Sequence, residues 1–383
     1  MISRMQPKYY LSKEIFDLER KRIFSKLWLF AGIKQMLPEH NSFLTRDVAG
    51  VPVVIQNFNG TIRAFENTCL HRSAKIQWEA FGRRPLLCRY HGWGYARDGS
   101  VQNIPFEKEI YQFSADERRC LKLREFAVEL VGGIIFINLA TAPIPITDQF
   151  SAAFLETLSS SSNAYDTEVM HTTLKGKFNW KLAYENLRDS NHVRFVHAQS
   201  LAKYVAFEST VDPVASAKAR EPLPEPKSRS GMCEELRQLS FGGADSQVSN
   251  LRKFKWHESI NRFGDADNYY NWLAYPNMHA SSADGGYSFI IEHHIPVSAD
   301  QTDVEVYRFT ARKRQSYSYS HQVLLTQMHG HKVILDEDIK IMEMVQAGLH
   351  GGSAPAQQGE YEVMNKIVER WYEAMMESNN DLV

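Results

Sequence analysis

The chain has 383 residues and a formal net charge of −1, with 43% apolar and 23% charged residues. This balance is typical of a globular protein with a full core, folded as two ordinary domains or as one large domain with an insertion. The small net charge argues against nucleic acid or an anionic membrane as the main partner. The sequence contains no run of about 18 apolar residues, so we expect no membrane-spanning helix.

The four cysteines and the N-terminal residues indicate the cellular compartment in which the protein is expected. Residues 1–7 lack the apolar stretch of a secretory signal. Two of the cysteines belong to a motif described below, which leaves Cys120 and Cys233. Two remaining thiols in a chain of this length do not indicate a disulfide framework, so we expect a cytoplasmic protein.

The first part of the chain predicts one helix followed by a β domain. Residues 12–28 place apolar side chains at helical spacing, and Ser12 can cap the start. From about 41 to 140 the pattern is that of strands, with hairpin signals at Asn59-Gly60 and Gly132-Gly133.

Two mixed cysteine and histidine pairs lie inside this β region. Cys69 and His71 form the first pair, and Cys88 and His91 form the second. Two cysteines and two histidines are the ligands of a Rieske [2Fe–2S] centre, and both loops are similar to those of Rieske domains. Zinc also binds two cysteines and two histidines, but its usual motifs place Cys close to Cys and His close to His. A zinc site or two packed core histidines are therefore the alternatives.

The second part of the chain mixes helices and strands. The pattern predicts a helix near 147–160, antiparallel strands around 287–296 and 303–312, and an amphipathic helix over 360–378. The stretch 211–250 is rich in Pro, Ser, Glu and Gly, which indicates either a surface excursion or a mobile cover over a site. His293 and His294 fall in one strand, so we expect one to face inward and the other water.

A second candidate metal motif lies at 178–200. Glu185, Asp189 and His192 fall on one face of a helix, whereas His197 is about 140° round from His192. Both histidines can face one metal only if the helix ends or widens between them, as at a π-type turn. Two histidines with a nearby carboxylate are typical of the facial triad of non-haem Fe(II) oxygenases.

The two motifs together resemble the catalytic alpha subunits of Rieske non-haem iron ring-hydroxylating oxygenases. This resemblance covers nearly the whole chain and implies an α+β fold. A small all-β Rieske domain at 40–145 would be inserted in a catalytic domain formed by 1–39 and 146–383. That domain would hold an antiparallel sheet flanked by helices, of the helix-grip or START-like kind.

The resemblance also implies roles for single residues. Cys69, His71, Cys88 and His91 would bind the cluster, and His192, His197 and Asp338 would bind mononuclear iron. Asp336 competes with Asp338 as the third iron ligand, but the two point roughly 200° apart on a helix. A solvated acidic face suits Asp336 and Glu337.

One further residue role and the assembly follow from the same family. Asp189 would bridge His192 and, in a neighbouring subunit, His91. This bridge requires a head-to-tail ring, expected to be a homotrimer and possibly joined by a small beta subunit.

The implied function is that of the terminal oxygenase component in a multicomponent Rieske system. It would use O2 and electrons from NADH, delivered by a separate reductase and possibly a ferredoxin, because no dinucleotide fingerprint is visible in the sequence. An aromatic acid or related ring compound is the first substrate choice, with Arg188 and Arg194 as conceivable partners of its carboxylate. The alternative is a monooxygenase that demethylates or cleaves an N-methylated amine or betaine.

Two other classes of protein are alternatives. A Rieske electron carrier needs only about 100 residues and leaves the second motif unexplained. A zinc-stabilised binding protein without catalysis is the other, and metal analysis distinguishes all three classes. Basic residues around the cluster loops, Arg72, Lys75, Arg83, Arg84 and Arg89, suggest either a docking patch for an acidic redox partner or ordinary solubilising charge.

Overall fold

The computed structural model describes residues 5–189, 192–203, 240–247, 251–352, 355–359 and 363–377. The chain divides into two compact units, one formed by Met1–Arg22 with Pro145–Val383 and the other by Ile23–Ile144. The second unit starts well before residue 40 because β1 (Leu29–Ile33) pairs with β9 (Ile134–Asn138). Of the predicted excursion at 211–250, only 240–247 lies inside the described residues.

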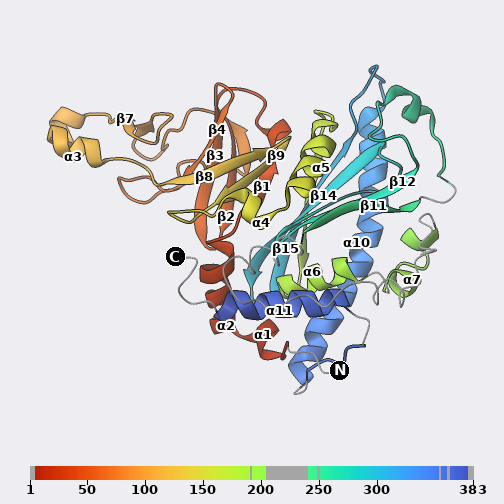
Figure 1. Ribbon diagram of the computed structural model, residues 1–383. Helices are drawn as coiled ribbons and strands as arrows, with labels where there is room; N and C mark the ends of the chain where they lie inside the picture. Colours follow the sequence, from red (N-terminus) through yellow and green to blue (C-terminus); the bar gives the residue numbers. More distant parts are fainter. Residues whose placement is uncertain are drawn as a thin grey trace. The chain divides into compact units, whose positions relative to one another are not determined.

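The Ile23–Ile144 unit is built almost entirely from antiparallel strands (Figure 1). Its seven-stranded sheet has the order β1-β9-β8-β4-β3-β2-β5, and β6 and β7 form a separate pair. The remaining strands of the unit are β2 (Ser42–Val48), β3 (Val51–Phe58), β4 (Thr61–Glu66), β5 (Phe81–Arg83), β6 (Gly94–Tyr95), β7 (Val101–Asn103) and β8 (Glu125–Val131). Its short helical segments are η2 (Lys34–Met36), η3 (Glu107–Tyr111) and α3 (Ala115–Cys120).

The predicted turns of this unit form where the sequence places them. Asn59 and Gly60 join β3 to β4 with φ angles of 54° and 90°. A two-residue hairpin turn of type I′ requires a positive φ at both of these positions. Gly132 and Gly133 join β8 to β9, and Val131 pairs with Ile134 across the turn.

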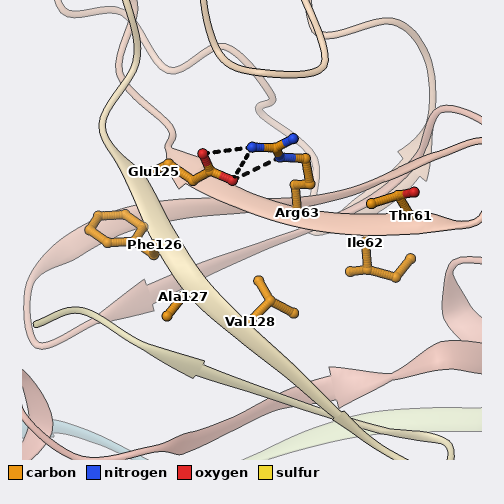
Figure 2. A pocket seen from close by; sticks show the side chains of 7 residues that line it. All are labelled: Thr61, Ile62, Arg63, Glu125, Phe126, Ala127 and Val128. Atoms are coloured by element: carbon orange, nitrogen blue, oxygen red, sulfur yellow. Dashed lines mark hydrogen bonds and ion pairs between the residues drawn. The ribbon is translucent and has the colours of Figure 1, made fainter. Parts of the chain in front are cut away.

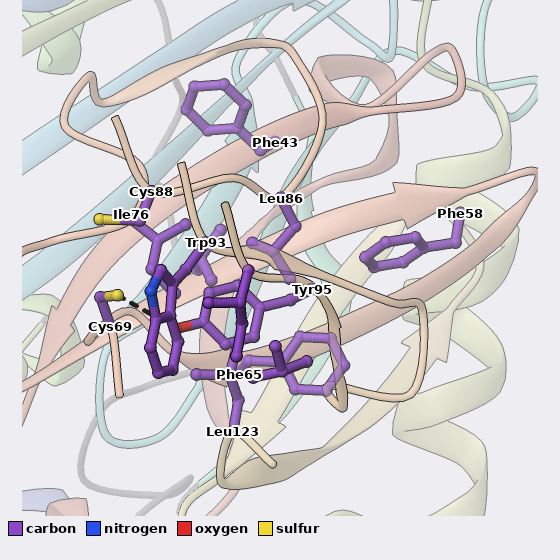
Figure 3. Packing of buried hydrophobic residues seen from close by; sticks show 13 residues of the cluster. Phe43, Phe58, Phe65, Cys69, Ile76, Leu86, Cys88, Trp93, Tyr95 and Leu123 are labelled. Atoms are coloured by element: carbon purple, nitrogen blue, oxygen red, sulfur yellow. Dashed lines mark hydrogen bonds between the residues drawn. The ribbon is translucent and has the colours of Figure 1, made fainter. Parts of the chain in front are cut away.

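One hydrophobic cluster of this unit surrounds the two cysteines of the first motif. Figure 3 shows the sulfur atoms of Cys69 and Cys88 at the same end of the cluster, with Trp93 and Tyr95 beside them. The cluster also contains Phe43, Val54, Phe58, Phe65, Ile76, Leu86, Val101, Ile104 and Leu123. The loops that carry the cysteines are therefore fixed by the core of the unit.

The larger unit contains a second antiparallel sheet with the order β10-β15-β14-β13-β12-β11 (Figure 1). Its strands are β10 (Met170–Gly176), β11 (Phe241–Gln247), β12 (Asn268–Ala274), β13 (Met278–Ser282), β14 (Ser288–Ser298) and β15 (Gln301–Thr310). The longest helix, α10 (Ser320–Gly351), contacts β10 and β15. The other helical segments are α1 (Lys8–Leu11), α2 (Lys13–Glu19), η1 (Arg20–Phe24), α4 (Ile146–Gln149), α5 (Ala152–Asn163), α6 (Trp180–Arg188), α7 (Val193–Val196), η4 (Leu201–Lys203), η5 (Lys255–Ser259) and α11 (Val363–Glu377).

These elements confirm the predicted α+β class, with a β-rich part and an antiparallel sheet flanked by helices. The N-terminal helix is shorter than predicted. Ser12 caps α2 by accepting from the Ile15 backbone N–H, but a π-helical turn follows at η1, and the chain is already a strand at Leu29. Within the described residues no helix combines the length and the apolar content that crossing a bilayer requires.

Candidate metal centres

The two loops of the first motif have the same backbone form. The Cys69 carbonyl accepts from the Ser73 N–H at 2.9 Å, and the Cys88 carbonyl accepts from the Gly92 N–H at 2.9 Å. Gly92 has a φ of +73°, and a Cβ there would lie 2.8 Å from the ring of Pro105. Each tight loop therefore returns the chain within a few residues of its cysteine.

The thiols and the imidazoles of this motif differ in burial. Cys69 and Cys88 are buried at 3% and 1% exposure, whereas His71 and His91 are half-buried. The rings of the two histidines meet edge to face with centroids 4.6 Å apart, and His71 stacks on Trp93. The thiol side thus lies in the core and the imidazole side reaches the surface.

The same four residues favour a diiron cluster over a single ion. Burial raises the pKa of the Cys88 thiol, and neighbouring Cys69 adds to this shift, so the two sulfur atoms lie close together. The His71 Nδ1 atom is buried and has no hydrogen-bond partner. Burial, then the charges of His91 and Arg72, lower the pKa of His71, which favours the neutral imidazole that a metal needs. Two paired sulfurs and two paired imidazoles fit the two irons of a Rieske centre.

A compact site for one ion is found elsewhere. Among the described residues, His192, His197 and Asp338 are the one group of three or more such side chains whose ligand atoms all lie within 4.8 Å of one another.

The helix before the second motif is anchored by its first residues. The Asn179 side chain caps α6 by accepting from the Lys181 N–H. The Lys181 ammonium lies 2.6 Å from Glu19 Oε1, and the Trp180 indole N–H donates to Glu19 Oε2 at 2.8 Å. Because these groups are buried and mutually paired, they hold α6 in a fixed position.

The chain leaves the helix between Glu185 and His197, as the second motif requires. α6 ends at Arg188, and Asp189 has an extended backbone with φ −91° and ψ 111°. His192 and His197 then flank the single turn of α7. The expectation that Glu185, Asp189 and His192 share one helix face is therefore wrong. The helix ends before both histidines, and the residues between them form α7.

The structure brings His192 and His197 together with Asp338 of α10. The Asp338 Oδ1 atom lies 3.0 Å from His197 Nε2 and 3.6 Å from His192 Nε2. Asn186 donates to the same oxygen at 2.9 Å. Two imidazoles and one carboxylate in this arrangement can hold a ferrous ion on one face.

The two acids beside Asp338 have different surroundings. Asp336 is exposed and pairs with Lys332 at 2.7 Å, so it points away from the histidines. Glu337 lies with its Oε2 atom 2.8 Å from His197 Nδ1 and accepts from the Ser200 hydroxyl at 2.5 Å. The placement of Glu337 on a solvated face was wrong, because it contacts the side of His197 opposite Asp338.

Electrostatics around His197 also suit a cation. Burial lowers the pKa of His197, but Asp338 and then Glu337 act more strongly, so the net shift is upward. Two carboxylates therefore stabilise positive charge at this imidazole, and a metal ion can take the place of the proton.

Asp189 and Glu185 have separate environments. The Asp189 Oδ2 atom lies 3.7 Å from His192 Nδ1, a buried nitrogen that has no hydrogen-bond partner. Glu185 instead accepts from the Tyr10 hydroxyl at 2.7 Å. Asp189 is thus placed beside the iron motif, whereas Glu185 joins α6 to the N-terminal helices.

Several charged side chains named from the sequence have partners of their own. Arg188 is buried, and its Nη1 lies 3.5 Å from the Tyr184 hydroxyl, whereas Arg194 is exposed. Of the basic residues around the cluster loops, Arg84 and Arg89 both pair with Glu79.

A surface hollow of about 450 Å³ lies between β4 and β8, in the same unit as the first motif (Figure 2). It is lined by Thr61, Ile62, Arg63, Glu125, Phe126, Ala127 and Val128. Its two charged side chains are paired with each other, since Arg63 donates to Glu125 at 2.7 and 2.8 Å. None of the candidate metal ligands lines this hollow.

Comparison with protein families matches both parts of the chain. Residues 27–114 match the Rieske [2Fe-2S] domain, and residues 164–378 match the catalytic domain of the ring hydroxylating alpha subunit. The chain belongs to the ring-hydroxylating alpha subunits. The [2Fe–2S] Rieske cluster and a mononuclear iron are the cofactors of this family, which consists of oxidoreductases.

Sequence relatives of this alpha subunit act on different compounds. It is 33% identical over 215 residues to the glycine betaine monooxygenase oxygenase subunit of Pseudomonas aeruginosa, covering 54% of the chain and 48% of the relative. It is 34% identical over 195 residues to the large oxygenase component of the naphthalene 1,2-dioxygenase system of Pseudomonas putida, covering 49% and 43%. The matches thus span about half the length of these curated relatives.

Solved structures with the same fold cover nearly the whole chain. The quaternary ammonium Rieske monooxygenase CntA in complex with L-carnitine matches with a TM-score of 0.68 and 18% identity, covering 97% of this chain and 94% of that one. Naphthalene 1,2-dioxygenase with indole bound matches with a TM-score of 0.69 and 21% identity, covering 99% and 93%. At these identities the likeness establishes the fold alone.

Proposed function

We propose that this chain is the terminal oxygenase component of a multicomponent Rieske system. It hydroxylates a small organic substrate with O2 and electrons from NADH, which a separate reductase delivers. The observation that carries this proposal is the gathering of His192, His197 and Asp338 in a chain that also carries the Cys69, His71, Cys88 and His91 loops. A Rieske electron carrier would need only the Cys69, His71, Cys88 and His91 loops.

The two donor sets divide the chemistry between them. A cluster bound at the first set supplies single electrons, and a ferrous ion bound at the second supplies activation of dioxygen. The protein contributes the tuning of both sites. The Tyr95 hydroxyl donates to Cys69 Sγ at 3.1 Å and accepts from the Leu70 N–H at 3.0 Å. A hydrogen bond to a ligating sulfur raises the reduction potential of such a cluster.

At the second set the supporting residues fix the ligands. Asn186 donates to Asp338, and Glu337 holds the His197 Nδ1. These contacts leave His197 Nε2 turned toward Asp338, where both can bind the metal. Outer partners of this kind orient ligands and preserve metal affinity.

Asp189 has a positioning role in this proposal. Its carboxylate lies beside His192, and His91 is half-buried on its own unit. Asp189 would link His192 to His91 of a neighbouring subunit in a head-to-tail homotrimer. The reductase, a ferredoxin and a small beta subunit are the further partners that this assembly could take.

The first substrate choice is an aromatic acid or related ring compound, and the alternative is an N-methylated amine or betaine. Both substrate classes have support among the relatives, because the matched proteins include a naphthalene dioxygenase and a glycine betaine monooxygenase.

The test is oxygen uptake by the purified chain with NADH, a Rieske-system reductase and a panel of aromatic acids and methylated amines. We expect one class to stimulate oxygen uptake and to yield an oxidised product. Protein with both metal sites filled that is reduced by the reductase but oxidises no organic compound of either class would overturn the proposal.

A further inference from the structure

The sheet of the larger unit presents a buried polar face to α10. Residues alternate along β12–β15, and those on this side include Asn271, His279, Ser288, Glu292, His294 and Arg308. We call these six residues the inner face. Two contacts show that the inner face is turned toward α10. His331 of α10 lies 2.9 Å from Glu292 Oε1, and Gln327 of α10 accepts from Arg308 at 2.6 Å.

The opposite side of the same strands is an aromatic core. Trp272, Phe289 and Phe309 are each less than 2% exposed and pack against one another. His293 and His294 are both buried, at 5% and 7% exposure, so the expectation that one of them faces water was wrong. Burying polar groups is costly, and a polar interior face next to a metal motif is typical of a binding site rather than of a core.

The inner face continues the surface of α10 that carries Asp338. Gln327, His331 and Asp338 are spaced by four and seven residues, so they lie on one side of the helix. The helical rise places Gln327 and Asp338 about 16 Å apart along the axis.

Arg308 is a buried cation without a carboxylate partner among the described residues. It is 6% exposed, and its Nη2 donates to Ser288 Oγ and to Gln327 Oε1, both at 2.6 Å. Its Nε is buried and has no hydrogen-bond partner. The acid whose charge acts on it is Asp284, which accepts a hydrogen bond from Ser288 Oγ. Burial lowers the pKa of Arg308 to about 10, and the charge of Asp284 opposes this shift.

A buried guanidinium with an unused N–H is suited to a carboxylate. A guanidinium N–H donates charge-assisted hydrogen bonds to carboxylates, and desolvation strengthens such bonds. The neutral partners Ser288 and Gln327 hold the guanidinium in place without cancelling its charge.

We propose that Arg308 binds the carboxylate of the substrate, so that the chain acts on small organic carboxylates. This inference rests on the proposed function, because it takes the inner face as the substrate site of that oxygenase. It applies equally to an aromatic acid and to a betaine, which share the carboxylate. An unsubstituted arene would leave the buried Nε of Arg308 without a partner.

The experiment measures binding to the anaerobic, metal-loaded protein by titration calorimetry. The probes are benzoate with benzamide, and glycine betaine with its amide. We expect one of the two acids to bind the natural chain at least about tenfold more tightly than its amide. Which acid binds then distinguishes an aromatic acid from a betaine.

Variants test whether Arg308 causes the preference for the acid over its amide. Arg308→Gln should abolish the difference between acid and amide, and Arg308→Lys should retain part of it. Arg312→Gln, which removes an exposed arginine just beyond the same strand, should leave the difference unchanged. Iron content and the visible spectrum report whether each variant is folded and loaded.

Three results would overturn the inference. They are equal binding of acid and amide by the natural chain, no binding of either acid at millimolar concentration, and unchanged acid binding by metal-loaded Arg308→Gln. If Arg308→Gln does not fold, the comparison of acid with amide on the natural chain decides. Because no turnover is measured, these outcomes are separate from a failure of the proposed function, which would appear as missing iron or missing oxygen uptake.

Discussion

The Glu337 carboxylate lies 2.8 Å from Nδ1 of His197, on the side of the imidazole opposite Asp338. This contact fixes which nitrogen of His197 is left to bind a metal. It comes from a residue next to Asp338 in the sequence, so one turn of α10 supplies both a candidate ligand and the group that orients another.

Removal of this contact should weaken iron binding without unfolding the chain. We expect Glu337→Ala to lower the affinity for the mononuclear iron about 10- to 100-fold, and Glu337→Gln to lower it less, because the amide can still accept from His197. Asp336→Asn is the matched control, since Asp336 is exposed and pairs with Lys332. Iron retained during chelator dialysis is the measurement, and equal retention by Glu337→Ala and the natural chain would contradict this role.

Asp338 should be required for the mononuclear iron alone. Asp338→Ala removes the oxygen that faces both His192 and His197, so we expect loss of that iron. The visible spectrum of the cluster should persist, because the Cys69 and Cys88 loops belong to the other unit. Iron analysis with absorption spectroscopy checks both points. If Asp336→Ala loses the iron instead, Asp336 is the ligand.

Asp189 should affect turnover more than metal content. Asp189→Asn retains the size of the side chain beside His192 but removes its charge. We expect both metal sites to remain largely filled, and the spectrum of the reduced protein to recover more slowly with substrate and oxygen than in the natural chain. Stopped-flow absorption measures this rate, and an unchanged rate would count against the proposed link to His91.

Glu185 should make the stability of the chain depend on pH. Burial raises its pKa to about 7, although the Tyr10 hydroxyl and Lys181 oppose the shift. Between an ordinary pKa of 4.5 and this value, the folded chain retains a proton that the unfolded chain has released. The contribution of Glu185 to the free energy of unfolding is therefore fully present below pH 4.5. It falls as the pH rises toward 7, by at most about 3 kcal/mol.

The variant Glu185→Gln removes this titration and can still accept from Tyr10. Its melting temperature should exceed that of the natural chain at pH 8 but not at pH 4.5, while exposed Glu258→Gln should change neither. If the melting temperatures of Glu185→Gln and of the natural chain change with pH in parallel, Glu185 ionises normally.

Local signals in the sequence predicted the elements that depend on local chemistry. The Ser12 cap and the Asn59-Gly60 turn form as expected, because each is determined by a few neighbouring residues. The end of α6 at Arg188 had a readable signal, since Asp189, Ser190 and Asn191 all favour helix ends over helix interiors. The π-type turn considered between His192 and His197 does not form, because the residues between them make the single α-helical turn of α7.

Other features depend on pairing between distant segments and could not be seen in the sequence. Leu29–Ile33 becomes a strand because it pairs with β9, more than 100 residues away. The contact of Glu337 with His197 and that of Arg308 with Gln327 both depend on how α10 packs. Periodicity assigns such residues to a face of their own element, but it does not identify the group that the face meets.

In the proposed oxygenase this chain binds a sulfide-bridged diiron cluster and a separate ferrous ion. Quantitative analysis of iron, zinc and acid-labile sulfide in anaerobically purified protein tests it most directly. We expect about three irons and about two sulfides per chain, with the visible absorption of a Rieske centre. Colourless protein that contains zinc and no sulfide would contradict it.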